Sequence, residues 1–281
     1  MRRITLFLLL LIACSSEKPE IKAKKLLETG KLKEAEAILL ESDTPSVLSR
    51  ILLGEVYTRM GKLDRALTAF KSAGYNLKKD EKNFLSTGLL ELAQKAQEQN
   101  YYLIAREAYE RLLEVDPDAD IGDGLKFLAD YYFRLGDKRK ALSYYEMYLN
   151  RGGDFEEIAT NYAQCLLAVG DYRKLAEYYD ELRKIREADT DWILQEGLYK
   201  LAEQLYEEEQ YDSAALYLKK LLGLRTNDLY TDRANLLLGR VYEALYDTLN
   251  AIRAYSEYLR SPRKKGSLAD EVRQRLKALT R

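Results

Sequence analysis

Apolar and small residues recur at helical spacing along this chain, in pairs of segments separated by a single turn residue. Gly54 and Tyr57 lie three positions apart, so they share one face of a first helix. Ala66 and Phe70 lie four positions apart and share one face of a second helix. Gly61, between the two segments, can adopt the left-handed conformation that ends a helix. The pattern predicts a helical hairpin in which small residues let the backbones approach and aromatic rings fill the space beside them.

The same five roles return along the chain, which makes the pattern far more specific than one hairpin would be. Successive turn residues stand 31 to 39 positions apart. Leu175, in the fifth set, stands where the pattern expects alanine. Besides the set around Gly61, the six sets are Ala23, Leu26, Gly30, Ala35 and Leu39; Ala93, Ala96, Asn100, Ala105 and Tyr109; Ala129, Tyr132, Gly136, Ala141 and Tyr145; Ala163, Leu166, Gly170, Leu175 and Tyr179; Ala202, Leu205, Glu209, Ala214 and Leu218; and Gly239, Tyr242, Tyr246, Ala251 and Tyr255.

This recurrence resembles the tetratricopeptide repeat, a helical hairpin of about 34 residues. The resemblance implies an all-α fold: a right-handed α-solenoid of about seven hairpins over residues 21–264. Residues 265–281 contain a charged amphipathic segment. We expect this segment to be a C-terminal capping helix, because the exposed end of a solenoid needs a polar cover.

The N-terminal residues are typical of an export signal rather than of the repeats. Arg2 and Arg3 precede an unbroken apolar run, residues 6–13, and Cys14 follows it. The run is too short to span a bilayer. The end of the run together with Cys14 resembles the lipobox of bacterial lipoproteins.

The lipoprotein resemblance implies that residues 1–13 are a signal peptide that is removed, and that Cys14 is lipidated on its sulfur and its new amine by acyl chains such as palmitate. Residues 14–20 would then form a lipidated tether. Ser15, rather than an aspartate, follows the cysteine. In that family this implies the outer membrane, with the protein facing the periplasm. Each buried acyl methylene contributes about 0.8 kcal/mol to anchoring.

Composition excludes several classes of function. The chain has 45 basic and 46 acidic residues, so no basic excess indicates nucleic acid as a partner. It has no histidine, which removes Ser-His-Asp and Cys-His catalysis and His-ligated zinc. No glycine-rich phosphate loop occurs in the sequence. We therefore expect no enzyme activity, no catalytic residues, no metal and no cofactor.

Two features that suggest chemistry do not support it on closer inspection. Residues 116–123 carry acids at alternate positions, as calcium loops do, but Ile121 stands where an EF-hand needs glycine and Phe127 where it needs glutamate. Cys165 is the cysteine that remains once Cys14 is lipidated, so no internal disulfide can form. We expect Cys165 to be a small buried side chain.

Function is therefore expected from a surface. In the tetratricopeptide family the first helices of the hairpins line the concave face, and the register identifies the side chains that point into it. Tyrosines beside carboxylates there suit a peptide that brings basic or amide groups, although Tyr199 and Tyr206 would equally suit packing between neighbouring helices. The candidate partner-binding residues are Lys126, Asp130, Phe133, Arg134, Glu196, Tyr199, Glu203 and Tyr206, with Gln94 and Gln97 on the same face earlier in the chain.

Two classes of function remain open. One is a non-catalytic protein–protein interaction scaffold, lipid-anchored at the periplasmic face of the outer membrane and acting in envelope or outer-membrane protein assembly. Residues 234–259 are similar to the tetratricopeptide lipoproteins of the β-barrel assembly complex. The other is a peptide- or cell-wall-binding module that recruits murein enzymes or captures secreted peptides. A hydrolase working with paired carboxylates is the remaining alternative, and it predicts an activity that is lost when one Asp or Glu of the concave groove is substituted.

Overall fold

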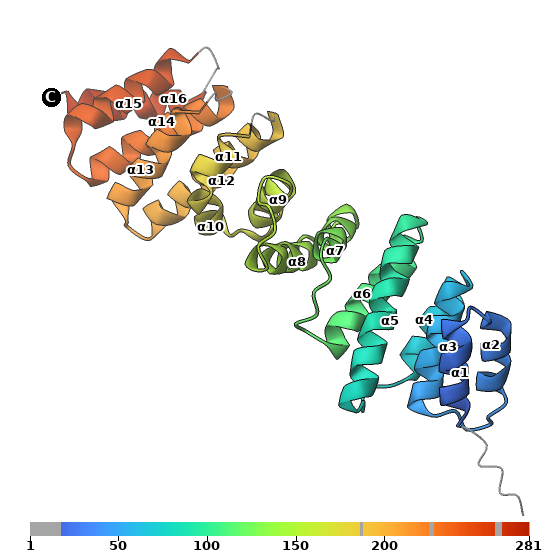
Figure 1. Ribbon diagram of the computed structural model, residues 1–281. Coiled ribbons are helices and arrows are strands. Elements are labelled where there is room, and N and C mark those ends of the chain that lie inside the picture. Colours follow the sequence, from blue (N-terminus) through green and yellow to red (C-terminus); the bar gives the residue numbers. More distant parts are fainter. Residues whose placement is uncertain (1–17, 186–187, 225–227, 262–265, 281) are drawn as a thin grey trace, which may run out of the picture. The chain divides into compact units, whose positions relative to one another are not determined.

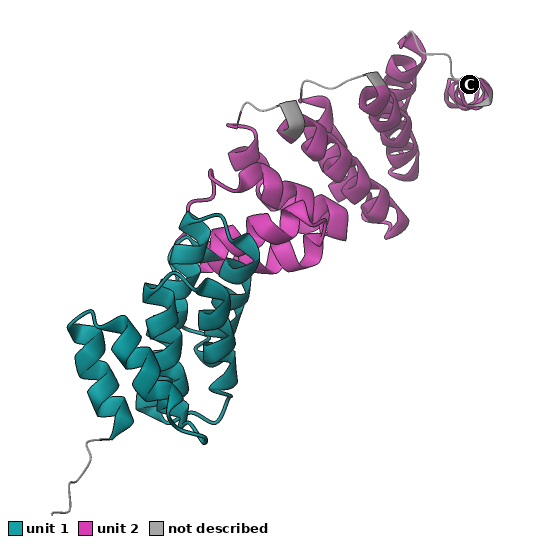
Figure 2. Cartoon of the chain, turned by 90° about the vertical axis from the view of Figure 1, so that its right-hand side faces the viewer, with its two compact units in different colours: residues 1–124 teal, residues 125–281 magenta. Residues whose placement is uncertain are grey.

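The computed structural model describes residues 18–185, 188–224, 228–261 and 266–280. These residues form sixteen α-helices and no strand, which confirms the predicted all-α fold. The predicted signal peptide and Cys14 lie outside the described residues. The chain divides into two compact units, residues 1–124 and residues 125–281 (Figure 2).

Unit 1 consists of three hairpins (Figure 1). Within it the first helices of the hairpins lie side by side, and the second helices of the second and third hairpins also pack together. The unit therefore has a first-helix face and a second-helix face. The hairpins are α1 (Pro19–Glu28) with α2 (Leu32–Leu40), α3 (Val47–Arg59) with α4 (Leu63–Ser72), and α5 (Lys79–Glu98) with α6 (Tyr102–Val115).

Unit 2 continues the same pattern with four further hairpins and a closing helix. Its first helix begins at the last residue of unit 1. The elements are α7 (Gly124–Arg134) with α8 (Lys138–Asn150), α9 (Ala159–Val169) with α10 (Tyr172–Glu177) and α11 (Tyr179–Leu182), α12 (Ala188–Glu207) with α13 (Tyr211–Leu222), α14 (Asp228–Ala244) with α15 (Thr248–Arg260), and α16 (Ser267–Leu279).

All seven predicted turn residues adopt the left-handed conformation, with φ between 58° and 84°. Four of them are glycines, which adopt it freely, but Asn100, Glu209 and Tyr246 adopt it with a side chain present. After each turn residue, the next backbone N–H donates to a carbonyl five residues earlier, as Lys62 does to Tyr57 at 2.9 Å and Tyr101 to Ala96 at 2.8 Å. This bond closes the helix end.

Glycines in first helices make room for large side chains of second helices. Phe70 is completely buried. A Cβ at Gly54, in the same hairpin, would lie 2.5 Å from the Phe70 ring, and a Cβ at Gly88, in the next hairpin, would lie 2.7 Å from it. The ring therefore fills a space that exists because both neighbouring helices carry glycine there.

The fifth hairpin departs from the predicted pair of continuous helices. Its second helix is interrupted at Tyr178, between α10 and α11. The Tyr178 ring stacks on Phe155 with 4.8 Å between centroids and meets the edge of Tyr162 at 5.4 Å. Leu175 replaces the expected alanine. Its side chain fits because Gly197 has no Cβ, and a Cβ at that position would collide with it.

The two ends of the repeat array also differ slightly from the prediction. Residues 19 and 20, predicted as tether, already belong to α1, because proline suits the first helical position. At the other end, α16 packs Val272, which is completely buried, against Tyr255 and Tyr258 of α15. A charged helix thus covers the last hairpin.

Candidate functional site

The predicted site residues on α7 are engaged by the neighbouring helices. Lys126 Nζ lies 2.5 Å from a carboxylate oxygen of Glu157, and this hydrogen bond raises the pKa of Lys126. Asp130 accepts a hydrogen bond from the hydroxyl of Tyr145 at 2.5 Å and one from the amide of Asn161 at 3.4 Å. The two residues therefore tie α7 to α8 and to the fifth hairpin.

The other two predicted residues of α7 lie near its end. The ammonium group of Lys138 covers the ring of Phe133, 2.9 Å from its centroid. Burial lowers the pKa of Lys138. Arg134 is exposed. Of the four residues predicted on α7, Arg134 is the one most open to solvent.

The predicted residues on α12 form a cluster with α14. Glu196 accepts a hydrogen bond from the Tyr230 hydroxyl at 3.2 Å, and the rings of Tyr199 and Tyr230 meet edge to face at 6.5 Å. The guanidinium of Arg233 lies 5.8 Å from the Tyr199 centroid and 5.9 Å from that of Tyr230. Burial raises the pKa of Tyr199. Tyr199 thus packs between two neighbouring first helices.

The remaining two predicted residues of α12 lie farther along the helix. Glu203 accepts a hydrogen bond from Lys200 Nζ at 2.9 Å. Tyr206 packs its ring against Tyr211, with 5.5 Å between centroids. Of the four predicted residues on α12, the structure therefore brings Glu196 and Tyr199 to α14, whereas Glu203 contacts its own helix and Tyr206 contacts α13.

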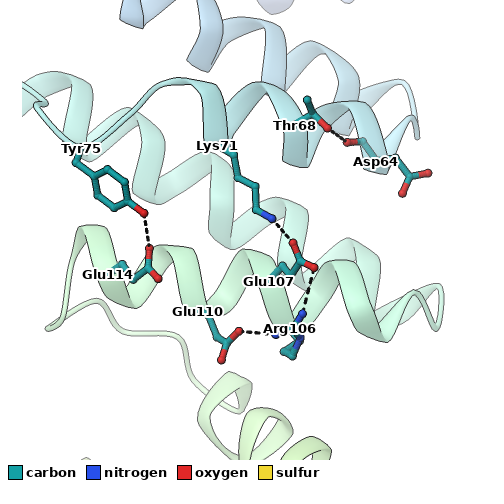
Figure 3. Close-up of polar contacts among 8 residues, drawn as sticks. All are labelled: Asp64, Thr68, Lys71, Tyr75, Arg106, Glu107, Glu110 and Glu114. Carbon is teal, nitrogen blue, oxygen red and sulfur yellow. Dashed lines mark hydrogen bonds and ion pairs between the residues drawn. The ribbon is translucent and has the colours of Figure 1, made fainter.

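A polar pocket of about 460 Å³ lies between α4 and α6 on the second-helix face of unit 1. In Figure 3 Lys71 of α4 points to Glu107 of α6, with which it forms an ion pair. Arg106 lies 3.1 Å from Glu107 and 2.9 Å from Glu110. Three glutamates and three basic residues line the pocket, so its charges balance.

Arg111 completes this network from a buried position. Its side chain is 5% exposed, and it lies 3.0 Å from Glu114 and donates to the carbonyl of Gly74. Its guanidinium stacks 3.8 Å from the centroid of Tyr75. The Tyr75 hydroxyl reaches Glu114 at 3.4 Å, as Figure 3 shows. Since these charges are paired, the pocket serves to fasten α4 to α6 rather than to hold a ligand.

A second pocket, of about 530 Å³, opens on the first-helix face of unit 1, and we call it the carboxylate pocket. Tyr109 is buried in it, and its hydroxyl donates to the amide oxygen of Gln97 at 3.0 Å. Burial raises the pKa of Tyr109 to about 12, with smaller contributions from the carboxylates of Asp123 and Glu98. The lining residues are Gln94, Gln97, Glu98, Tyr109, Ile121, Gly122, Asp123 and Gly124.

The two carboxylates of this pocket differ from Glu196 and Glu203, which are paired. Glu98 and Asp123 are exposed and make no hydrogen bond or ion pair with the described residues. Gly124 closes the wall beside them, because a Cβ there would lie 2.6 Å from the Tyr109 ring. Two unpaired carboxylates beside side-chain amides attract a cationic group that can donate several hydrogen bonds.

Sequence reasoning placed Gln94 and Gln97 on this face but missed Glu98, Tyr109 and Asp123 as one site. A signal was present, since Glu98 follows Gln94 by four residues and so shares its side of the helix. In the sequence, Asp123 stands out only as one of the alternating acids of residues 116–123, the loop before α7. Its position beside Glu98 depends on how that loop returns over α6.

The described residues offer little else in the way of chemistry. Among them, no group of three potential metal-ligating residues has a geometry that could hold an ion, and no helix has the length and apolar character needed to cross a membrane. Cys165 is completely buried, and burial raises the pKa of its thiol to about 11. A thiol in this environment is protonated and inert near neutral pH.

Comparison with known proteins finds a family match for part of the chain. The tetratricopeptide repeat family matches residues 90–156. No curated protein matches the chain. A tetratricopeptide repeat protein from Parabacteroides merdae is 19% identical, with 94% of this chain and 98% of that chain covered and a TM-score of 0.35.

Two further solved structures show comparable similarity. The C-terminal part of a repeat-containing protein from Cytophaga hutchinsonii is 16% identical, with 89% and 98% of the two chains covered and a TM-score of 0.41. PilF from Pseudomonas aeruginosa is 17% identical, with 92% and 96% covered and a TM-score of 0.30. The family match identifies residues 90–156 as tetratricopeptide repeat, and all seven hairpins share the left-handed turn residue found in that stretch.

Proposed function

We propose that this protein is a non-catalytic interaction scaffold that is held by lipid on Cys14 at the periplasmic face of the outer membrane and binds envelope proteins there. The repeat fold supports the scaffold role, because stacked hairpins present extended surfaces for partners. The anchor is proposed from the lipobox-like sequence that ends at Cys14.

The observation that carries the binding proposal is the carboxylate pocket. On the first-helix face of unit 2 several charged groups are bridged to one another, as Lys126 is to Glu157 and Arg240 is to Glu271 at 3.4 Å. Glu98 and Asp123 have no such partner. A partner segment that inserts a lysine or arginine side chain would supply it, and a charge-assisted hydrogen bond to such a group is worth about 1.5–3 kcal/mol.

Peptide selection tests the binding role. A random peptide library would be selected on the chain from residue 14 onward, and the recovered peptides measured by calorimetry. We expect peptides that contain lysine or arginine, and binding at least about tenfold weaker to the Glu98→Gln/Asp123→Asn variant, a loss of about 1.4 kcal/mol.

Glu91→Gln is the matched control, because Glu91 is an exposed acid of the same helix that does not line the pocket. It should leave affinity unchanged. Recovery of no binding peptide, or equal affinity for the double variant, would reject the carboxylate pocket as a recognition site. Specific binding to murein glycan strands instead of protein segments would favour a cell-wall-binding module.

The anchoring half has its own test. Radiolabelled palmitate should enter the wild-type protein in intact cells and should not enter a Cys14→Ala variant. Crosslinking in the same cells should recover outer-membrane assembly proteins. A protein that stays unlabelled and fractionates with the soluble periplasm has no lipid anchor.

A further inference from the structure

We propose that one edge of unit 1 rests directly on the lipid surface, so that the protein touches the bilayer with its fold as well as with its acyl chains. This inference rests on the proposed anchoring at Cys14. The edge concerned is formed by the starts of α1, α3 and α5 and the ends of α2 and α4, and we call it the loop edge.

Contacts between helix ends bring these segments together (Figure 1). Glu20 at the start of α1 accepts hydrogen bonds from Ser46 at 2.6 Å and Ser49 at 2.8 Å, at the start of α3. Arg50 of α3 donates to the carbonyl of Ser72, at the end of α4, at 2.7 Å. These bonds lie at the same edge, so the edge is a continuous surface.

Four large hydrophobic side chains stand exposed on the loop edge: Ile21 at 46%, Leu40 at 56%, Tyr75 at 76% and Phe84 at 43%. They come from the start of α1, the end of α2, the segment after α4 and the first part of α5. Scattered exposed hydrophobic residues are ordinary on a protein surface. Four of them lie toward one edge of three neighbouring hairpins, where one surface can cover them together.

A cation lies against one face of each of the two aromatic rings, Phe84 and Tyr75. The ammonium of Lys24 lies 3.8 Å from the Phe84 centroid, and the guanidinium of Arg111 lies 3.8 Å from the Tyr75 centroid. One face of each ring is thereby occupied from within the protein. Rings that are fixed in this way lose little conformational entropy when a second surface covers them.

The polar residues of the loop edge suit the interfacial region of a bilayer. Lys22, Lys78 and Lys79 are exposed there, beside the acids Glu41 and Asp80. Lysine can lay its apolar stem along lipid while its ammonium stays among the headgroups, and tyrosine favours the same boundary. Since both signs of charge are present, the contact does not require an anionic lipid.

The point at which the chain leaves α1 toward Cys14 favours the bilayer as the occupant. Four residues lie between Cys14 and Pro19, where α1 begins, and an extended chain spans at most about 18 Å over the five steps from one to the other. The hairpin turn at Gly30 lies beyond the far end of α1, which adds about 15 Å for its ten residues. The chain leaves α1 at the loop edge, so a lipid on Cys14 is attached nearer to this edge than to the edge with the hairpin turns.

The opposite edge supplies a matched control. Tyr101, Tyr102 and Leu103, at the turn between α5 and α6, are exposed to 55%, 43% and 57%. They are as apolar as the loop edge but lie a full helix length away from it, and α5 has 20 residues. A general stickiness of exposed apolar residues would affect both edges equally.

The test uses the lipidated full-length protein in phosphatidylcholine vesicles, with an environment-sensitive NBD dye on an introduced cysteine. Tyr75→Cys and Leu40→Cys report on the loop edge, and Leu103→Cys reports on the opposite edge. The native Cys165 is completely buried, and the protein without an introduced cysteine gives the background. We expect nitroxide-labelled lipid to quench the dye at positions 40 and 75 severalfold more strongly than at position 103.

The outcomes separate this inference from the function on which it rests. If the protein sediments with the vesicles but the dyes at positions 40 and 75 are quenched no more than at 103, the anchor stands and the loop-edge contact is rejected. If the protein does not sediment with them, the anchor fails and this inference fails with it. Quenching that requires added phosphatidylglycerol would replace the apolar contact by an ionic one and would also overturn the inference.

Discussion

Replacing Phe70 by alanine should be among the most damaging single changes in unit 1. The ring is completely buried, and its neighbours Gly54 and Gly88 have no side chain to move into the space that it leaves. A buried aromatic side chain removes about 150–250 Å² from water. At about 25 cal/mol per Å², losing about 150 Å² costs about 4 kcal/mol, within the 3–5 kcal/mol typical of Phe→Ala.

Because the cavity should not collapse, we expect a loss of about 4–5 kcal/mol, at the upper end of that range. Urea unfolding followed by circular dichroism measures the loss. Repeat proteins can unfold in parts, so hydrogen exchange should accompany it. Exchange should accelerate most in α3, α4 and α5, the helices that surround the ring.

A double-mutant cycle tests the packing argument itself. Gly54→Ala alone should destabilise, because its Cβ would lie 2.5 Å from the ring and overpacking costs about 1–3 kcal/mol, against about 1 kcal/mol gained in helix propensity. In the Phe70→Ala background the same change should stabilise, since the methyl group enters a cavity. If Gly54→Ala has the same effect in both backgrounds, the ring and the glycine are not coupled and our account of this contact is wrong.

Three further predictions concern other parts of the chain. Glu209→Gly should raise the melting temperature, because Glu209 has φ 59° and a left-handed residue with a side chain costs about 1–2 kcal/mol. The greater entropy of glycine in the unfolded chain offsets about 0.4–1 kcal/mol of this gain, so a net stabilisation remains. Gly197→Ala should destabilise through its collision with Leu175, and a second change, Leu175→Ala, should recover part of the loss in urea titrations. Stability should fall as pH rises above 10, because the unfolded chain then releases tyrosine protons that the native chain retains. Tyr109, with a pKa of about 12 in place of 10.0, contributes up to about 1.4 kcal/mol per pH unit to this fall between those two values. Tyr109→Phe should therefore make the decline of stability with pH less steep.

Each of these predictions has a definite contrary result. Gly136→Ala is the control for the turn, because glycine already occupies a left-handed turn with φ 82° there, and it should lower the melting temperature. Equal melting temperatures for all turn variants would show that turn strain is not stored in these positions. If the effects of Gly197→Ala and Leu175→Ala on stability are additive, the two positions are not coupled and the proposed collision is wrong. An unchanged alkaline profile for Tyr109→Phe would show that this hydroxyl does not titrate with unfolding.

Sequence alone predicted the repeats well because one local requirement recurs at each turn. A helix that reverses within three residues needs a left-handed residue, and that requirement identified even Glu209 and Tyr246, which are not glycines. The interruption at Tyr178 was not predictable in the same way. It coincides with the stacking of this ring on Phe155, 23 residues earlier, and no local propensity specifies such a contact.

The candidate site was less predictable, because register shows which way a side chain points but not what it meets. Lys126 was correctly assigned to a first helix, yet its partner Glu157 comes from the next hairpin, 31 residues away. Glu98 and Asp123 lack such a partner, and that difference becomes visible once the neighbouring hairpin is in place. Whether a charge is free or paired is therefore a property of two adjacent repeats.

The fit of large side chains onto glycines limits how this array can be shortened. Gly88 and Gly124 both stand twelve residues before a left-handed turn, so excising the stretch from 88 to 123 would leave Phe70 opposite a glycine again and preserve the joint. The same excision at Gly197 would bring Leu175 opposite Ala234, which carries a methyl group where a bare backbone is needed. Hairpins of this protein can thus replace one another at some junctions but not at others. A shortened or grafted version should be cut where both the hairpin removed and the hairpin that takes its place carry glycine opposite the large side chain of the preceding hairpin.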